Sequence, residues 1–214
     1  MLTRTALPSI VLSALFTFNT WAFEVTVLDK DGQPLNNIAV LATSEHHPAA
    51  VEQKNLDAVM DQINRQFVPH TLIVQKGTRV SFPNSDSVQH HVYSFSPAKN
   101  FELQLYSELE VEPLLFDRAG AVELGCNVHD WMLGYIYVVD TPFFTQTNPQ
   151  GKGSLALPEG SFSISVWHPR ISDNDQATSL TVDASANSVT FQLTEALLPS
   201  LVEYDAVEGF NQYD

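Results

Sequence analysis

GCNVHDWM, residues 125–132, is the stretch of sequence that decides the fold of this chain. It holds the one cysteine of the chain, Cys126, and His129 and Met132 follow it at intervals of three residues. Alternating apolar segments of strand length lie on both sides of the stretch. The pattern predicts a loop between two β-strands that brings a thiolate, an imidazole and a thioether close together.

A second histidine source lies upstream in NSDSVQHHVY, residues 84–93. Two imidazoles, one thiolate and a weak axial thioether form the trigonal site that suits copper in both oxidation states. Structural zinc sites more often use several thiolates and no thioether. We therefore expect one type 1 copper ion held by Cys126, His129, Met132 and one histidine of the upstream pair.

From about Phe67 to Val139 the chain resembles the plastocyanin and amicyanin branch of the cupredoxins. The C-x-x-H-x-x-M spacing is similar to the short ligand loop of amicyanin and pseudoazurin. The run HHVYSFSP is similar to one in bacterial proteins labelled methylamine-utilisation or plastocyanin-like. The resemblance implies a Greek-key β-sandwich and a role in electron transport. It also places the upstream ligand at His90, because the family carries a valine two positions later, here Val92.

His91 departs from the resembled pattern, in which an asparagine at this position ties the strand to the cysteine loop. In an extended strand His90 and His91 point to opposite faces, so only one of them can face the ion unless a bulge intervenes. We expect His90 to be the ligand and keep His91 as the alternative. The departure also predicts a weakened tie between the strand and the loop, or an altered reduction potential.

Further β patterns at both ends of the chain, residues 27–40 and 155–166, are similar to strands of the carboxypeptidase-regulatory-like, transthyretin-like sandwiches. We expect an all-β protein in which this small sandwich is discontinuous. The predicted divisions are a signal peptide at 1–22, the small sandwich at 23–44 plus 141–198, the copper-binding domain at 45–140 and an acidic tail at 199–214. Two consecutive domains are the alternative. Residues 49–66 contain few β-branched residues and predict a short helix or a long loop.

The N-terminus is typical of a secretory leader. One positive charge, Arg4, precedes the apolar residues 6–18, which are too short to span a bilayer, and a small residue, Ala22, ends the segment. We expect cleavage after Ala22, export to the periplasm and no membrane attachment afterwards. An uncleaved anchor is the alternative. A single cysteine in an exported chain cannot form an internal disulfide, and metal binding would protect it.

The charge of the chain favours some partners over others. Without Arg4 the chain has nine Lys and Arg against 25 Asp and Glu, a formal charge of −16. Such a charge disfavours nucleic acid and anionic membranes and favours a redox protein with a basic docking face, such as a c-type cytochrome.

Catalytic motifs are not apparent in the sequence. The chain has no G-x-S-x-G, no H-E-x-x-H and no phosphate-binding loop, and too few histidine pairs for a multicopper oxidase. We expect no enzymatic activity and favour a carrier of single electrons. A copper chaperone, buffer or resistance protein is one alternative, and a partner-binding module with structural copper is another.

Overall fold

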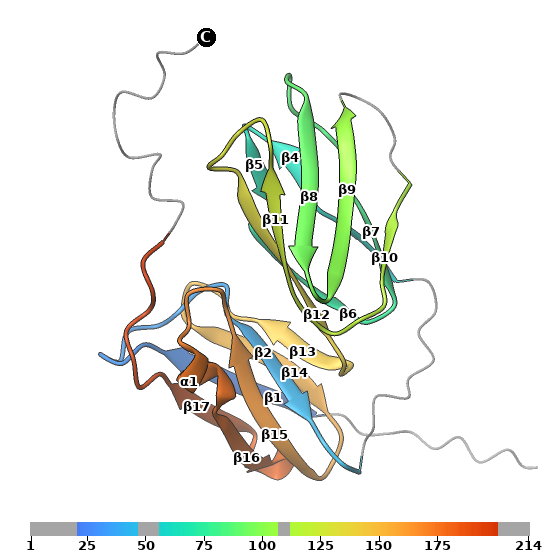
Figure 1. Ribbon diagram of the computed structural model, residues 1–214. Helices are drawn as coiled ribbons and strands as arrows, with labels where there is room; N and C mark the ends of the chain where they lie inside the picture. Colours follow the sequence, from blue (N-terminus) through green and yellow to red (C-terminus); the bar gives the residue numbers. More distant parts are fainter. Residues whose placement is uncertain (1–20, 47–55, 107–111, 201–214) are drawn as a thin grey trace, which may run out of the picture.

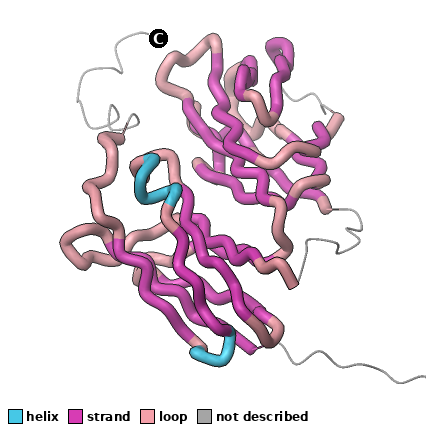
Figure 2. The backbone as a smooth tube through the Cα atoms, turned by 60° about the horizontal axis from the view of Figure 1, so that its bottom comes forward, coloured by secondary structure: helices cyan, strands magenta, loops and turns pink. Residues whose placement is uncertain are grey.

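Two β-sandwiches, one above the other in Figure 1, make up the protein. The computed structural model describes residues 21–46, 56–106 and 112–200. Strands dominate these residues (Figure 2), so the all-β expectation is confirmed. Residues 1–20 of the expected leader (1–22) and residues 201–214 of the expected tail (199–214) lie outside the described residues. No helix in the described part of the chain is long and apolar enough to cross a membrane.

The first sandwich carries the cysteine loop. A five-stranded sheet in the order β6-β12-β11-β8-β9 faces a three-stranded sheet in the order β10-β7-β3, and the β4-β5 hairpin adjoins them. The strands are β3 (Asp57–Val59), β4 (Asp61–Ile63), β5 (Gln66–Val68), β6 (Thr71–Gln75), β7 (Thr78–Ser81), β8 (His90–Ser96), β9 (Lys99–Tyr106), β10 (Leu114–Phe116), β11 (Gly120–Cys126) and β12 (Leu133–Val139).

The expectation of a helix or loop over residues 49–66 is wrong where the structure describes it. Two short strands, β3 and β4, lie in this region and β5 begins at its end, because β3 pairs in parallel with β7 and β4 pairs with β5. The pairing of β3 with a strand about 20 residues further along the chain supplies its backbone hydrogen bonds. The residues of β3 alone therefore do not predict a strand. Residues 47–55 lie outside the described part.

Alternation of buried and exposed residues builds the core of the first sandwich. β8 and β11 each turn every second side chain inward, as a half-buried strand does. The fully buried side chains of this core include Met60, Phe82, Val92, Phe116 and Leu124. Cys126 and Met132 belong to the same core, so the cysteine loop is packed against a rigid interior.

The second sandwich combines strands from both ends of the chain. A sheet in the order β14-β1-β17 faces one in the order β13-β2-β15-β16. Its elements are β1 (Trp21–Leu28), β2 (Ala39–Thr43), β13 (Phe143–Gln146), β14 (Lys152–Leu157), β15 (Ser161–Trp167), the helix α1 (Asp173–Ala177), β16 (Ser179–Asp183), a 3₁₀ turn (Ala184–Ala186) and β17 (Ser188–Gln192).

Both strands that open the chain pair with strands that follow the first sandwich. β1 lies between β14 and β17, and β2 lies between β13 and β15. The bounds proposed for the domains stay a prediction. β1 begins at Trp21, so cleavage after Ala22 would remove its first two residues, which pair with Leu157 and Ala156.

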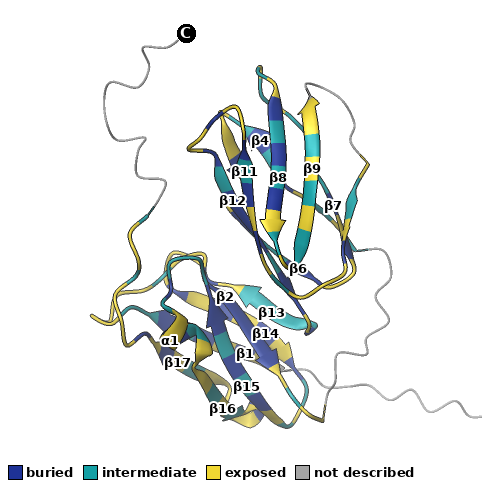
Figure 3. Cartoon of the chain, in the orientation of Figure 1, coloured by how far each residue is buried: buried dark blue, intermediate teal, exposed yellow. Residues whose placement is uncertain are grey.

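A third apolar cluster joins the two sandwiches. β12 and β2 are buried along most of their length (Figure 3), because each faces its own core on one side and the other sandwich on the opposite side. Trp167 of β15, 8% exposed, stacks on Tyr137 of β12 with ring centroids 4.2 Å apart and planes 7° from parallel. Ala39, Leu41, Tyr135 and Val139 complete the buried part of this joining cluster.

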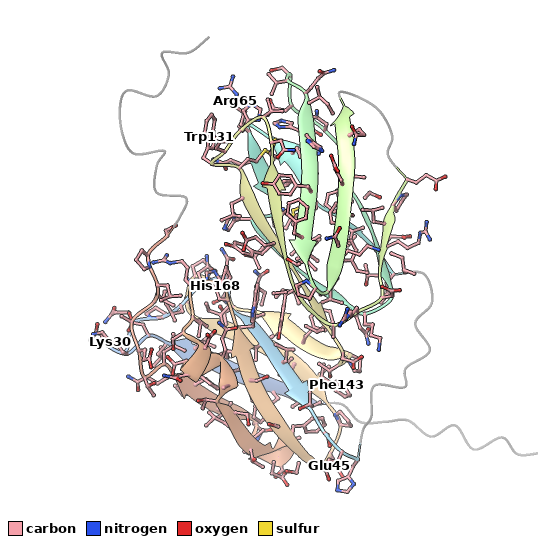
Figure 4. The ribbon with its side chains drawn as sticks, viewed as in Figure 1. Lys30, Glu45, Arg65, Trp131, Phe143 and His168 are labelled. Carbon is pink, nitrogen blue, oxygen red and sulfur yellow. The ribbon has the colours of Figure 1, made fainter. Side chains whose placement is uncertain are left out.

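His168 follows Trp167 at the same junction (Figure 4). Its Nδ1 accepts a hydrogen bond from the backbone N–H of Arg170 at 3.2 Å, which requires the neutral ring. Burial lowers the pKa of His168 to about 4, and the positive charge of Arg170 and of His70 lowers it further. The folded protein therefore keeps this imidazole neutral.

Acidification is expected to destabilise the fold through His168. The unfolded chain takes up this proton below about pH 6.5, whereas the folded chain does so only near pH 4. Stability present above pH 6.5 is therefore lost as the pH falls toward 4, by roughly 1–3 kcal/mol after solvent screening. Urea unfolding at pH 7 and pH 4.5 measures the effect. His168→Asn keeps an acceptor for Arg170 but cannot be protonated, so its stability should fall less. Equal losses in both proteins would contradict the assignment.

Candidate metal centre

The end of β11 and a tight turn place three side chains in one loop. Cys126 is the last residue of β11, and β12 begins at Leu133. The backbone N–H of Met132 donates to the carbonyl of His129 at 2.9 Å, which closes a four-residue turn. The turn brings the chain back toward the core directly after His129.

β8 supplies the upstream histidine. It runs antiparallel beside β11, with Val92 opposite Cys126. The pairing of β8 with β9 shifts register between His90 and Val92, which marks a bulge at this point. His90 is 0% exposed and faces the cysteine, whereas His91 lies on the opposite face of the strand.

His90, Cys126 and His129 form a compact triangle of donor atoms. Cys126 Sγ lies 3.8 Å from His90 Nδ1 and 3.7 Å from His129 Nδ1, and one donor atom from each residue lies within 4.8 Å of the others. Metal–sulfur and metal–nitrogen bonds of about 2.3 and about 2.0 Å at a trigonal angle put these atoms about 3.7 Å apart. The spacing of the side chains fits one metal ion that these three residues would hold.

Met132 completes the set of soft donors around the triangle. It is buried in the same core as Cys126, and the two residues line one surface groove together with Tyr93 and Phe95. A thioether beside a His₂Cys plane is the donor set of a type 1 copper site. The donors present therefore fit one type 1 copper ion, which His90, Cys126, His129 and Met132 would hold.

His129 is the member of the triangle nearest to solvent. It is 9% exposed, against 3% for Cys126. Its ring lies 5.6 Å from that of Trp131, which is exposed, and Arg65 lies at the same end of the sandwich (Figure 4). Burial lowers the pKa of His129, and positive charge on His90 and Arg65 lowers it further. A neutral imidazole is the form that binds a metal.

Asp86 is a residue of the site to which the sequence assigned no role. Its Oδ2 lies 3.1 Å from His90 Nε2 and accepts the backbone N–H of Arg65 at 2.6 Å. Its Oδ1 accepts the backbone N–H of Ser87 at 2.9 Å. Burial raises the pKa of Asp86, but the hydrogen bonds from Arg65, His90 and Ser87 outweigh it and hold the pKa below its usual value. The one feature of the sequence that could have indicated this contact is the position of Asp86, four residues before His90.

His91 forms the tie between the strand and the cysteine loop. The side-chain amide of Asn127, directly after the cysteine, lies 2.7 Å from His91 Nδ1. On the other side His91 Nε2 lies 2.9 Å from Glu102 Oε1 of β9. The tie is therefore present with different residues: a histidine on β8 and an asparagine in the loop. His91 takes no part in the donor triangle.

Comparisons with known proteins give similar solved structures. No protein-family model matches the chain, and no curated protein matches it. A reduced amicyanin mutant is 23% identical over 47% of this chain and 98% of its own, with a TM-score of 0.37. An oxidised amicyanin mutant is 21% identical over the same shares, with a TM-score of 0.36. A purple cupredoxin from Nitrosopumilus maritimus is 23% identical over 40% of this chain and 100% of its own, with a TM-score of 0.31.

These identities and scores are low, so the assignment of the site depends on its own geometry. The first sandwich holds a buried histidine from one strand and a cysteine, a histidine and a methionine from the adjoining loop. That arrangement of donors on a β-sandwich is the one expected of a type 1 copper site. The first sandwich therefore carries the donor set that the resemblance to the cupredoxins implies.

Proposed function

We propose that this chain is an exported carrier of single electrons between redox proteins. The observation that carries the proposal is the preset donor triangle, in which Cys126 Sγ already lies 3.8 and 3.7 Å from the two imidazole nitrogens. Bound copper would supply a one-electron couple. A site whose donors are fixed by two strands and a turn changes little when the charge of the ion changes, which favours fast electron transfer.

Different residues of the site would bind the ion and exchange electrons with a partner. His90 and Cys126 are buried and hold the ion away from water. His129 lies nearest to solvent and contacts the exposed ring of Trp131, so it is the proposed edge for electron exchange. Such a site differs from an open enzyme centre, because four side chains, His90, Cys126, His129 and Met132, would fill the coordination of the ion. We therefore propose a carrier rather than a catalyst.

Voltammetry and a copper-transfer assay on the copper-loaded protein test the proposal. A carrier should give a reversible one-electron wave and fast electron self-exchange, and should lose copper slowly to an excess of a Cu(I) chelator. A chaperone or buffer should instead transfer copper rapidly to the chelator. An irreversible wave would overturn the carrier, and rapid copper loss beside it would favour the chaperone or buffer. Export would be tested by the N-terminus of the protein in a periplasmic fraction, expected at Phe23.

The proposed partner is a redox protein with a basic docking face. The chain has a formal charge of −15 at pH 7. With a basic c-type cytochrome as the probe, the second-order rate of electron transfer should fall about tenfold between 10 and 200 mM salt, since screening weakens steering. Anionic hexacyanoferrate is the control and should react faster as salt rises. A rate with the cytochrome that does not depend on salt would remove the basic partner.

A further inference from the structure

Asp86 connects a neighbouring hairpin to a histidine of the donor triangle. The loop of residues 84–87 precedes β8, and the Asp86 side chain is largely buried within it. One carboxylate oxygen, Oδ2, meets both the backbone N–H of Arg65 and Nε2 of His90. The other oxygen accepts from Ser87. Because three partners surround it, the carboxylate has little freedom to turn away from the imidazole.

The position of this carboxylate determines which nitrogen of His90 carries the proton. An ionised carboxylate only accepts hydrogen bonds, so the Nε2 that faces Asp86 must be the protonated nitrogen. Nδ1, which faces Cys126 Sγ at 3.8 Å, is then left with a free lone pair. Metal-binding histidines need this pairing, and outer carboxylates also make the ring a stronger donor.

The hairpin that meets Asp86 also meets a second aspartate. Asn64 and Arg65 at the β4-β5 turn have positive φ angles of 53° and 60°, which turn the Arg65 N–H toward the loop. Asp61 in β4 accepts the hydroxyl of Ser85 at 2.8 Å and its backbone N–H at 3.2 Å. Asp61 thus fastens the hairpin to the same loop, with Ser85 as its side-chain partner there. This difference supplies a matched control.

We propose that Asp86 is a positioning residue that fixes the tautomer of His90 and lowers the reduction potential of the site. The potential falls because the negative charge behind the imidazole favours Cu(II) over Cu(I). This part of the inference rests on the proposed copper function. The tautomer does not, since the hydrogen bond from Nε2 is present in the protein chain itself.

Nitrogen-15 NMR of the copper-free protein in alkaline buffer tests the tautomer. His90 in the unaltered protein should show a pyridine-type Nδ1 and a pyrrole-type Nε2. Asp86→Ala should mix the two tautomers, whereas Asp61→Ala should leave His90 unchanged. The same tautomer in Asp86→Ala as in the unaltered protein would overturn the assignment, whether or not copper serves in electron transfer.

Copper affinity and potential test the charge. Asp86→Asn keeps an acceptor oxygen for His90 and Arg65 but removes the charge, so the fold should be retained. Its Cu(II) affinity should fall about 10- to 100-fold, with a smaller loss for Cu(I). Each tenfold difference between the two losses raises the potential by about 59 mV. Asp61→Asn should leave the potential unchanged.

The possible results separate this inference from the proposed function. A potential in Asp86→Asn equal to that in Asp61→Asn would overturn the effect of charge. A reversible couple with a raised potential supports both proposals. An irreversible couple with the expected tautomers would end the carrier proposal and leave the positioning role of Asp86 intact.

Discussion

Replacement of Cys126 by serine is expected to abolish the intense visible absorption of the copper-loaded protein. The band arises from charge transfer between a thiolate and Cu(II), and Cys126 is the one cysteine of the chain. Its Sγ occupies the corner of the donor triangle that faces both imidazole nitrogens. A serine hydroxyl is a hard donor. With nitrogen and oxygen ligands alone, Cu(II) is expected to adopt the tetragonal geometry that it prefers.

Optical and EPR spectra of the two proteins, loaded with Cu(II), measure this effect. Met132→Leu is the matched control, because Met132 is a buried residue of the same loop and its replacement removes a thioether but keeps the thiolate. That variant should keep an intense band and change the potential, since the axial ligand tunes it. A pale, tetragonal spectrum that is the same with and without the thiol would mean that Cys126 does not bind copper.

Replacement of Trp167 by alanine is expected to have the largest effect on stability. The indole stacks on Tyr137 and lies against Tyr135 at 6.4 Å, so it fills the contact between the two sandwiches. Removing a buried aromatic side chain costs about 3–5 kcal/mol in a well-packed site. The joining cluster is small, so the sandwiches should also lose cooperativity and unfold in separate transitions.

Denaturant unfolding followed by two probes tests the expectation. Far-ultraviolet circular dichroism reports both sandwiches, whereas the visible copper band reports the first. The curves should coincide in the unaltered protein and separate in Trp167→Ala. Phe95→Ala is the control, because Phe95 is 76% exposed and its loss should change the free energy of unfolding by less than about 0.5 kcal/mol. Coincident curves and a similarly small loss in Trp167→Ala would contradict the role of the cluster.

The histidine pair illustrates the limit of reading a site from its sequence. Alternation along a strand shows that His90 and His91 face opposite ways, but the face turned to the cysteine depends on the register of β8 against β11. The structure places His90 in the donor triangle and His91 against Asn127 and Glu102. His91 stands where the resembled family has an asparagine, and the strand is still connected to the cysteine loop, through His91 and Asn127.

The short strands before the site illustrate the limit for the fold. Residues 57–59 carry no clear alternation and form a strand because β7 offers them a partner. The sequence of β12, LGYIYVV, is a continuous apolar run, which indicates burial on both faces of the strand. It does not identify the segment that covers the second face. The packing of Tyr135 and Tyr137 on Trp167 in the structure identifies the second sandwich as the cover.

The sequence by itself determined the all-β fold, because alternation and turn residues act over a few positions. It also determined that Cys126, His129 and Met132 share one loop, because the three residues lie within seven positions of the chain. The tertiary structure decided which histidine joins them, that Asp86 stands behind it, and that the two sandwiches share a buried junction. These features depend on strand register and on contacts between distant segments. Such contacts are set by packing energy summed over the whole fold, and no short stretch of residues encodes them.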